Sequence, residues 1–266
     1  MKIATWNVNG IRARAGEVIS LLERERPDVL CLQEIKASPA DVPDLLRDLA
    51  DYWSFWHGHK GYSGVSLHLR KSTFPARPPF SHPEFDHETR VVQARLGDLT
   101  VASVYVPNGG KDFDAKLRFL EGLTRYAAAE KQLILCGDLN VAREERDVHP
   151  KLRKQDQVGT TPVERELFSK ILGHGLVDLA RKFAPDDDRL FTWWAPWRNL
   201  KERNIGWRID YVLASEALAA KAISCAASRE FGSSDHAPVT VVLDVASPQY
   251  QAAPEVGPAA GQIPLL

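Results

Sequence analysis

The amino-acid sequence predicts an α/β protein in which two β-sheets pack face to face and helices cover the outside. Two observations lead to this fold class. Short apolar runs, such as residues 133–136, have the length and composition of strands that are buried on both faces. Each half of the chain also runs through strands and helices and places polar residues at strand ends. No linker-like segment interrupts residues 1–245, so we expect a single domain there.

The first part of the chain predicts a parallel pair of strands. Residues 2–8 form an apolar-rich strand, and apolar residues recur at helical spacing over 17–26 until Pro27 ends the helix. Residues 28–34 form a second buried strand. Because a helix joins the two strands, we expect them to pair in parallel. A short helix over 41–50 follows.

The middle of the chain predicts antiparallel strands and then a long helix. The strand patterns lie at 53–57, 63–70, 74–80, 90–96 and 99–106. Leu117, Leu120 and Leu123 share one side of a helix over 114–131, which leads to the buried strand 133–136. Gly137 ends that strand and lets the backbone turn.

The last part of the chain predicts a charged loop, a capped helix and the final strands. The loop covers 143–157, and Thr161, Pro162 and Glu164 form a helix start that should run to about Leu172. Further strands are expected at 190–194, 207–213, 222–228 and 239–245, with a short helix at 216–220 and an aromatic, basic loop at 195–204. Residues 246–266 are rich in Ala, Pro, Gly and Gln, which predicts a disordered tail.

Composition narrows the function classes. The 266 residues are 44% hydrophobic and 26% charged, which is typical of a globular protein, and no run of 18 apolar residues predicts a membrane span. A formal net charge of −1 disfavours coating of nucleic acid through bulk charge, although a local basic face would still serve an enzyme. The three cysteines lack motif spacing and the chain start lacks a signal-peptide pattern, so we expect a cytoplasmic protein.

Polar residues gather at the ends of the predicted strands. Asp138 and Asn140 are the clearest pair, because positions two apart in an extended chain project to the same side. Taken singly, such residues are more often turn formers, helix caps or structural ion pairs. Together they predict a cleft, because ligands in layered α/β folds bind outside the carboxyl ends of strands. The full set is Asn7, Asn9, Glu34, Tyr105, Asp138, Asn140, Asp210, Asp235 and His236.

Seven short motifs stand in order along the chain. They are WNVNGIRA at 6–13, LQEIK at 32–36, GYSGV at 61–65, YVPN at 105–108, GDLNVA at 137–142, GWRIDY at 206–211 and SDHAP at 234–238. In this order they closely resemble the exonuclease III family of apurinic/apyrimidinic endonucleases, within the DNase I-like endonuclease/exonuclease/phosphatase superfamily. The resemblance covers residues 2 to about 245.

The resemblance implies a fold, a cofactor and a reaction. The fold is a four-layered α/β sandwich with two mixed sheets face to face and helices outside. The reaction is hydrolysis of the DNA backbone 5′ to an abasic site, which leaves a 3′-hydroxyl, and 3′-phosphodiesterase and 3′-to-5′ exonuclease activities accompany it in many members. The implied metal is Mg²⁺, with Mn²⁺ as a substitute. The implied partner is double-stranded DNA with abasic sites or 3′ ends, bound by a monomer.

The resemblance also assigns metal-site positions. Glu34 matches the family's metal-binding glutamate, and Asp235 matches a second acid near the metal; hard carboxylate oxygens suit Mg²⁺. Asn9 stands where some relatives have an aspartate, so its role at the metal would be weaker or mediated by water.

The remaining strand-end residues match positions around the water and the phosphate. Asp138 would orient or deprotonate the attacking water, with Asn7 and Asn140 as hydrogen-bond donors beside it. His236, in its charged form stabilised by Asp210, and Tyr105 would contact the phosphate or the leaving oxygen.

Other residues match the DNA-binding part of the family. Trp193, Trp207 and Ile209 match a pocket for the flipped-out abasic sugar, although core packing would be the default for the two tryptophans without the resemblance. Trp194 and Trp197 are expected in the core or on a surface that faces the duplex. Candidates for phosphate contacts are Arg12, Lys36, Arg90, Lys111, Arg198, Lys201, Arg203 and Arg208.

Two other function classes stay open at this point. One is a hydrolase of the same superfamily that acts on an inositol phosphate or a phospholipid headgroup; the segment 207–210 and Trp193 argue against it. The other is a regulator that binds nucleic acid without catalysis. A binder has no need for the whole set of acids and His236, which disfavours that class.

Overall fold

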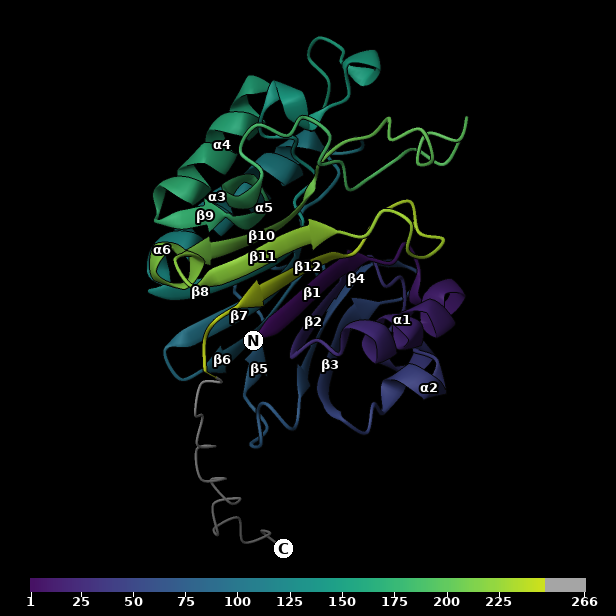
Figure 1. Ribbon diagram of the computed structural model, residues 1–266, viewed down its shortest axis with the longest axis vertical. Coiled ribbons are helices and arrows are strands. Elements are labelled where there is room, and N and C mark those ends of the chain that lie inside the picture. Colours follow the sequence, from purple (N-terminus) through teal and green to yellow (C-terminus); the bar gives the residue numbers. More distant parts are fainter. Residues whose placement is uncertain (247–266) are drawn as a thin grey trace, which may run out of the picture.

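The computed structural model of the protein describes residues 1–246, which form four layers (Figure 1). Two six-stranded sheets pack face to face in the middle. The helices α1 (Ile11–Glu25) and α2 (Asp44–Arg47) cover the outer face of one sheet, and α3 (Phe113–Ala129) and α4 (Pro162–Gly173) cover the outer face of the other. The predicted sandwich of two mixed sheets with helices outside is confirmed.

The first sheet has the strand order β11-β12-β1-β2-β4-β3. Its strands are β1 (Lys2–Asn7), β2 (Val29–Gln33), β3 (Tyr52–His59), β4 (Tyr62–Arg70), β11 (Ala222–Ala227) and β12 (Val239–Leu243). β1 pairs in parallel with β2, as their connection through α1 requires, and antiparallel with β12. The first and the last strand of the fold therefore lie side by side.

The second sheet has the strand order β5-β6-β7-β8-β10-β9. Its strands are β5 (Phe80–Ser81), β6 (Val91–Leu96), β7 (Leu99–Tyr105), β8 (Gln132–Asp138), β9 (Leu176–Asp178) and β10 (Asp210–Ser215). β7 and β8 are parallel and are joined through α3, whereas β10 runs antiparallel to β8. The carboxyl end of β8 thus lies beside the amino end of β10.

Apolar side chains fill the space between the sheets and the spaces under the helices. Ile134 and Cys136 belong to the core between the sheets, whereas Leu133 and Leu135 belong to the core under α3 and α4. The run 133–136 is therefore buried on both faces, as its composition predicts. A third apolar cluster lies under α1 and α2. Two short helices, α5 (Leu179–Phe183) and α6 (Glu216–Ala219), contact β10.

Several predicted elements differ from the structure. α1 begins at Ile11 rather than at residue 17. In place of the predicted helix at 41–50, the chain forms a single helical turn at Pro39–Asp41 and the short α2. The predicted strand at 74–80 is wrong, because its prolines lack the N–H that a sheet needs, and only Phe80–Ser81 pairs. The predicted strand at 190–194 is reduced to isolated bridges at Trp193. The predicted tail at 246–266 lies almost wholly outside the described residues.

Two further expectations concern cysteines and membranes. Cys31, Cys136 and Cys225 are all free thiols. Within residues 1–246, every helix falls short of the length and apolar character that a membrane crossing needs.

Candidate active site

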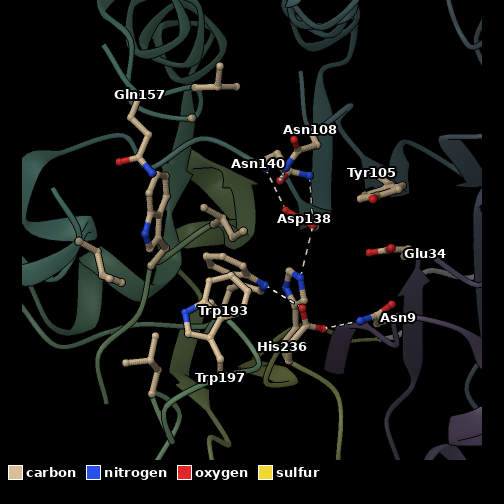
Figure 2. A pocket seen from close by; sticks show the side chains of 18 of the residues that line it. Asn9, Glu34, Tyr105, Asn108, Asp138, Asn140, Gln157, Trp193, Trp197 and His236 are labelled. Carbon is tan, nitrogen blue, oxygen red and sulfur yellow. Dashed lines mark hydrogen bonds and ion pairs between the residues drawn. The ribbon is translucent and has the colours of Figure 1, made fainter. Parts of the chain in front are cut away.

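A pocket of about 660 Å³ opens at the end of the sandwich where β1, β2, β7 and β8 finish (Figure 2). Its walls come from both sheets and from the loops that follow their strands. The predicted site residues that line it are Asn9, Glu34, Tyr105, Asp138, Asn140, Trp193, Trp207, Ile209, Asp235 and His236. Asn7 and Asp210 are buried directly behind this wall, where they contact Asp138 and His236.

Asp138 ends β8 at the centre of the pocket. The sheet register places it opposite Tyr105 of β7 and Asp210 of β10. Gly137 has a φ of 145°, and a Cβ there would lie 1.9 Å from the carbonyl oxygen of Val104. Only glycine fits this position, and the turn it allows sets the direction of the Asp138 carboxylate.

The Asp138 carboxylate is buried and held by amides. Its Oδ2 accepts hydrogen bonds from Nδ2 of Asn7 at 2.9 Å and from Nδ2 of Asn140 at 3.3 Å, and its Oδ1 accepts from the backbone N–H of Asn140 at 2.9 Å. Burial raises the pKa of Asp138 to about 7; the charge of His236 opposes this rise, and the charge of Asp210 adds to it. A carboxyl group with this pKa can take up a proton near neutral pH.

His236 is buried between two carboxylates. Its Nδ1 lies 2.9 Å from Oδ2 and 3.1 Å from Oδ1 of Asp210, and its Nε2 lies 3.8 Å from Oδ2 of Asp138. Thr192 holds Asp210 by donating its hydroxyl to Oδ2 at 2.6 Å. Burial lowers the pKa of His236, but the Asp210 carboxylate, together with the charges of Asp138 and Asp235, outweighs burial and raises the pKa to about 10. The imidazole therefore carries a positive charge at neutral pH.

Oxygen atoms that can bind a metal ion line the opposite wall of the pocket. Glu34 accepts from Nδ2 of Asn7 at 3.0 Å and pairs with Nζ of Lys36 at 2.8 Å. Asn9 accepts from the same Nζ at 2.7 Å and donates its Nδ2 to Asp235 at 2.9 Å. The Lys36 ammonium thus lies between the oxygen atoms of Glu34 and Asn9. The phosphate contact expected of Lys36 stays a prediction, since its side chain is 38% exposed.

Tyr105 lies between the two carboxylate-bearing walls. Burial raises the pKa of Tyr105 well above its ordinary value, and the negative charges of Glu34 and Asp138 add to the rise. The phenol therefore keeps its proton and is a hydrogen-bond donor. The Arg90 guanidinium lies 5.0 Å from the centre of the Tyr105 ring and donates to Glu88 at 2.8 Å. Arg90 is buried, so the expectation that it contacts DNA is wrong.

The other half of the pocket is aromatic. The Trp193 and Trp207 rings meet edge to face with 6.2 Å between their centres, and Ile209 lies beside them. Trp207 and Ile209 expose only 7% and 5% of their surface, so this side of the pocket is apolar and well packed. Trp194 belongs to a separate small core, whereas Trp197 is 60% exposed at the rim (Figure 2).

Six of the eight predicted basic residues are either buried or exposed, whereas Lys36 and Lys201 are half-buried. Arg208 is 1% exposed and forms ion pairs with Asp147 at 2.8 Å and with Asp178 at 2.6 Å, so the expectation that it contacts phosphate is wrong. Arg12 and Lys111 are exposed, as are Arg198 and Arg203 in the aromatic, basic loop. These side chains are accessible to a DNA backbone.

Lys116 is a site-building residue that the sequence did not indicate. Its fully buried ammonium pairs with Glu164 and donates to the backbone oxygens of Asn140 at 2.7 Å and Asn108 at 3.2 Å. Glu164 in turn accepts from the backbone N–H of Gly159 at 2.9 Å. One buried ion pair therefore fixes three loops around the pocket. On α3 this lysine resembles any surface lysine, and only the fold reveals that it is buried.

A buried group in the pocket also has the chemistry of a metal site. Asp138, Asp210 and His236 offer ligand atoms that all lie within 4.8 Å of one another. Carboxylate oxygens and imidazole nitrogens are common metal ligands, so this group could hold a metal ion.

Residues 4–236 match the model of the Endonuclease/Exonuclease/phosphatase family. The chain belongs to this family. Two of its relatives come from a bacterium and a fish. This chain is 34% identical over 253 residues to the exodeoxyribonuclease of Bacillus subtilis, and the match covers 92% of this chain and 100% of that protein. The chain is 35% identical over 260 residues to the DNA repair nuclease APEX1 of Danio rerio, and that match covers 92% of this chain and 83% of that protein.

Solved structures of the Endonuclease/Exonuclease/phosphatase family have the same fold. An AP endonuclease from Archaeoglobus fulgidus matches with a TM-score of 0.83 at 32% identity, over 92% of this chain and 100% of that one. The 3′ phosphatase NExo from Neisseria, bound to a product DNA hairpin, matches with a TM-score of 0.83 at 30% identity, again over 92% and 100%. The match to these nucleases supports the four-layered sandwich.

Proposed function

We propose that this protein is a DNA-repair hydrolase that cleaves the DNA backbone 5′ to abasic sites and leaves a 3′-hydroxyl. Its relatives named exodeoxyribonuclease, DNA repair nuclease and 3′ phosphatase support additional action at 3′ ends, as an exonuclease and a phosphodiesterase. One observation carries the proposal. A carboxyl group with a pKa near 7, Asp138, lies between the cationic His236 and an oxygen-lined wall, next to an aromatic slot.

A divalent metal fits the oxygen-lined wall. The Lys36 ammonium lies 2.8 Å from Glu34 and 2.7 Å from Asn9, so it would move aside for a metal ion to use these oxygens. Carboxylate and amide oxygens are the donors that Mg²⁺ prefers. We assign Mg²⁺, with Mn²⁺ as a substitute, to Glu34, Asn9 and Asp235. We do not place it at Asp138, because the His236 imidazolium already supplies the positive charge there. When bound, the metal neutralises charge that builds up on the phosphoryl oxygens.

The protein side chains then act on water and phosphate. Asp138 takes a proton from the attacking water, while Asn7 and Asn140 fix the carboxylate through their amide groups. The His236 imidazolium stabilises a phosphoryl oxygen, and the Tyr105 phenol donates a hydrogen bond to the phosphate or to the leaving oxygen. Asn7, Asp138 and His236 are preorganised, because they are buried and are held by hydrogen bonds within the site.

The aromatic slot selects the substrate. Trp193, Trp207 and Ile209 form an apolar wall against which a deoxyribose without its base can pack. Trp193 also donates its Nε1–H to Oδ2 of Asp235 at 2.9 Å, which ties the slot to the metal-site wall. A sugar seated in the slot is thereby kept in a fixed position relative to the metal-site carboxylates.

Duplex DNA is the proposed partner, and the protein acts as a monomer whose functional domain is residues 1–245. The exposed Arg12, Lys111, Arg198 and Arg203 are the proposed phosphate contacts. Binding should weaken steeply with salt, because each phosphate contact releases counterions. We propose that the protein acts in the cytoplasm at the nucleoid, where its DNA substrate would be found.

The test is strand cleavage of a duplex that carries one tetrahydrofuran abasic analogue, with Mg²⁺ or with excess EDTA. We expect a single incision 5′ to the analogue with Mg²⁺, no cleavage after chelation, and far slower cutting of an intact duplex. Equal cutting of both duplexes would refute abasic-site specificity. Release of phosphate from an inositol phosphate or a phospholipid headgroup, without incision of DNA, would favour the other hydrolase class. Cleavage that survives thorough chelation would refute the metal assignment.

A further inference from the structure

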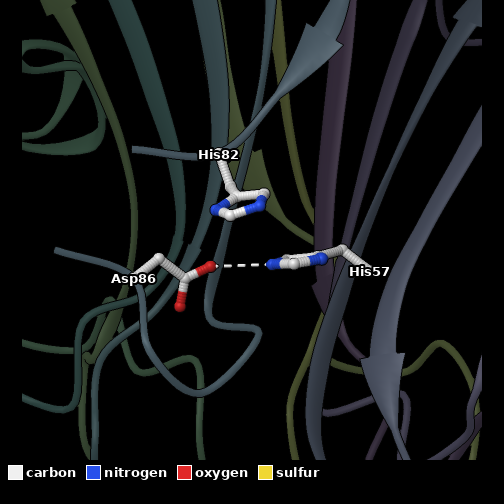
Figure 3. A group of neighbouring side chains, drawn as sticks. All are labelled: His57, His82 and Asp86. Carbon is white, nitrogen blue, oxygen red and sulfur yellow. Dashed lines mark hydrogen bonds and ion pairs between the residues drawn. The ribbon is translucent and has the colours of Figure 1, made fainter. Parts of the chain in front are cut away.

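A second cluster of metal-binding side chains lies away from the pocket, between the edges of the two sheets (Figure 3). His57 belongs to β3, the edge strand of the first sheet. His82 directly follows β5, the edge strand of the second sheet, and Asp86 lies in the loop that leads to β6. The sequence favours this region for such a site, since five of the eight histidines fall within residues 57–87.

The three side chains lie close together. Nε2 of His57 lies 2.8 Å from Oδ2 of Asp86, and the His57 and His82 rings stack with 4.7 Å between centres and 17° between planes. Each of the three residues offers a ligand atom within 4.8 Å of the other two. Figure 3 shows His82 above the line that joins His57 to Asp86.

The backbone holds the carboxylate of this cluster in place. The Asp86 side chain is fully buried; its Oδ1 accepts from the N–H of Arg90 at 2.8 Å, and its Oδ2 accepts from the N–H of Val91 at 3.1 Å. Hydrogen bonds of this kind orient metal ligands in proteins. His82 is exposed, so its ring can leave its stacked position on His57 and turn toward an ion.

We propose that His57, His82 and Asp86 bind a divalent first-row transition ion of the Zn²⁺ class, with water completing its coordination. Two imidazoles and one carboxylate are a typical donor set for such ions, whereas the all-oxygen wall at Glu34 suits Mg²⁺. Zinc ligands lie about 2.0–2.2 Å from the ion, which places tetrahedral neighbours about 3.3 Å apart. The pair of His57 and Asp86 therefore has to open by only about 0.5 Å from its present 2.8 Å.

The ion would connect elements that the backbone leaves separate. β3 and β5 belong to different sheets, so an ion held by His57 and His82 cross-links the two edges of the sandwich. The site is independent of the proposed nuclease chemistry, because it shares no residue with the pocket. Its expected effect is on stability rather than on cleavage.

The experiment uses the full-length protein, freed of metal with a chelator and returned to excess Mg²⁺. Titration with Co²⁺ should give one equivalent of binding with the visible absorption bands of a nitrogen-ligated ion. Zn²⁺ at a hundredfold excess over its dissociation constant should raise the melting temperature by about 5–10 °C. His82→Ala should lose both effects with an unchanged fold, because its side chain is exposed. His87→Ala, which removes an exposed histidine next to the cluster, should lose neither.

Two results would overturn the proposal. Absence of Co²⁺ and Zn²⁺ binding at micromolar concentrations would leave the cluster as a plain hydrogen-bonded pair of His57 and Asp86. Binding that persists in His82→Ala but disappears in Glu34→Gln would assign the ion to the nuclease pocket instead. Under the proposal, Glu34→Gln keeps the Co²⁺ bands and the Zn²⁺ stabilisation.

Discussion

Replacing Asp210 with asparagine should move the pH range in which the enzyme works. Asp210 contacts Nδ1 of His236 at 2.9 Å and is itself buried, so asparagine keeps the volume and removes the charge. That charge is the main cause that raises the pKa of His236, against burial, which lowers it. The same charge contributes to the raised pKa of Asp138.

The structure gives the size of the expected change. The rise in the pKa of His236 from 6.5 to about 10 corresponds to about 5 kcal/mol of preference for the charged ring. Without the Asp210 charge, the pKa of His236 should fall toward 6.5, because burial lowers it and only the charges of Asp138 and Asp235 then raise it. If the pKa falls fully to 6.5, about one ring in 30 is charged at pH 8, so cleavage there should fall by up to about 30-fold, with a smaller loss at pH 6.

The assay is the initial rate of incision at a tetrahydrofuran site between pH 5.5 and 10.5. In the unchanged protein, the rate should rise with pH as Asp138 loses its proton near pH 7, and it should fall as His236 loses its proton near pH 10. Asp210→Asn should move the fall to the acid side. The exposed Asp98→Asn, the same chemical change in a turn, should leave both limbs in place. A variant profile that is uniformly lower but unshifted would refute the role of the charge.

Three further predictions address other parts of the site. Asp138→Asn should lower single-turnover cleavage about 100- to 10,000-fold, while DNA affinity by fluorescence anisotropy is kept; a nearly normal rate would contradict proton abstraction by this residue. Trp207→Ala should reduce abasic incision more than exonuclease action on a plain duplex, and equal losses would argue against the sugar slot. Lys116→Met should lower the free energy of unfolding in urea by about 3–5 kcal/mol, because Glu164 keeps a buried, unpaired charge. The exposed Arg118→Met should change it by less than about 0.5 kcal/mol, and a similar loss in both variants would argue against the buried pair.

Strands were predictable where burial alone decides the residue type. The run 133–136 faces two cores and is apolar throughout, so its composition identifies it. The start of α1 was not predictable from spacing, because Gly10 precedes it without a capping side chain. β9 has only three residues, and it pairs with β10, which lies far along the chain. Elements of this length exist through tertiary contacts rather than local preference.

The polar site was predictable at strand ends and less so elsewhere. Asp138 and Asn140 follow a recognisable strand, so their positions indicate a cleft. Lys116 and Thr192 support the same site, but neither lies at a strand end. Arg208 shows the opposite case, since a basic residue next to a site residue proved to be a buried partner of Asp147 and Asp178. Charge alone does not tell whether a side chain meets solvent or another buried charge.

The pocket takes residues from beside both the first and the last strands of the fold, so its activity depends on how much of the chain has been synthesised. Asn7 lies on the first strand, β1, and His236 lies just before the last strand, β12. β1 and β12 are neighbours in the same sheet. A nascent polypeptide that stops before residue 236 lacks the imidazolium and the strand that closes the sheet against β1. Prematurely terminated or partly translated copies should therefore be unable to nick the chromosome. The protein gains nuclease activity only after His236 and β12 have been synthesised and the sheet has closed against β1.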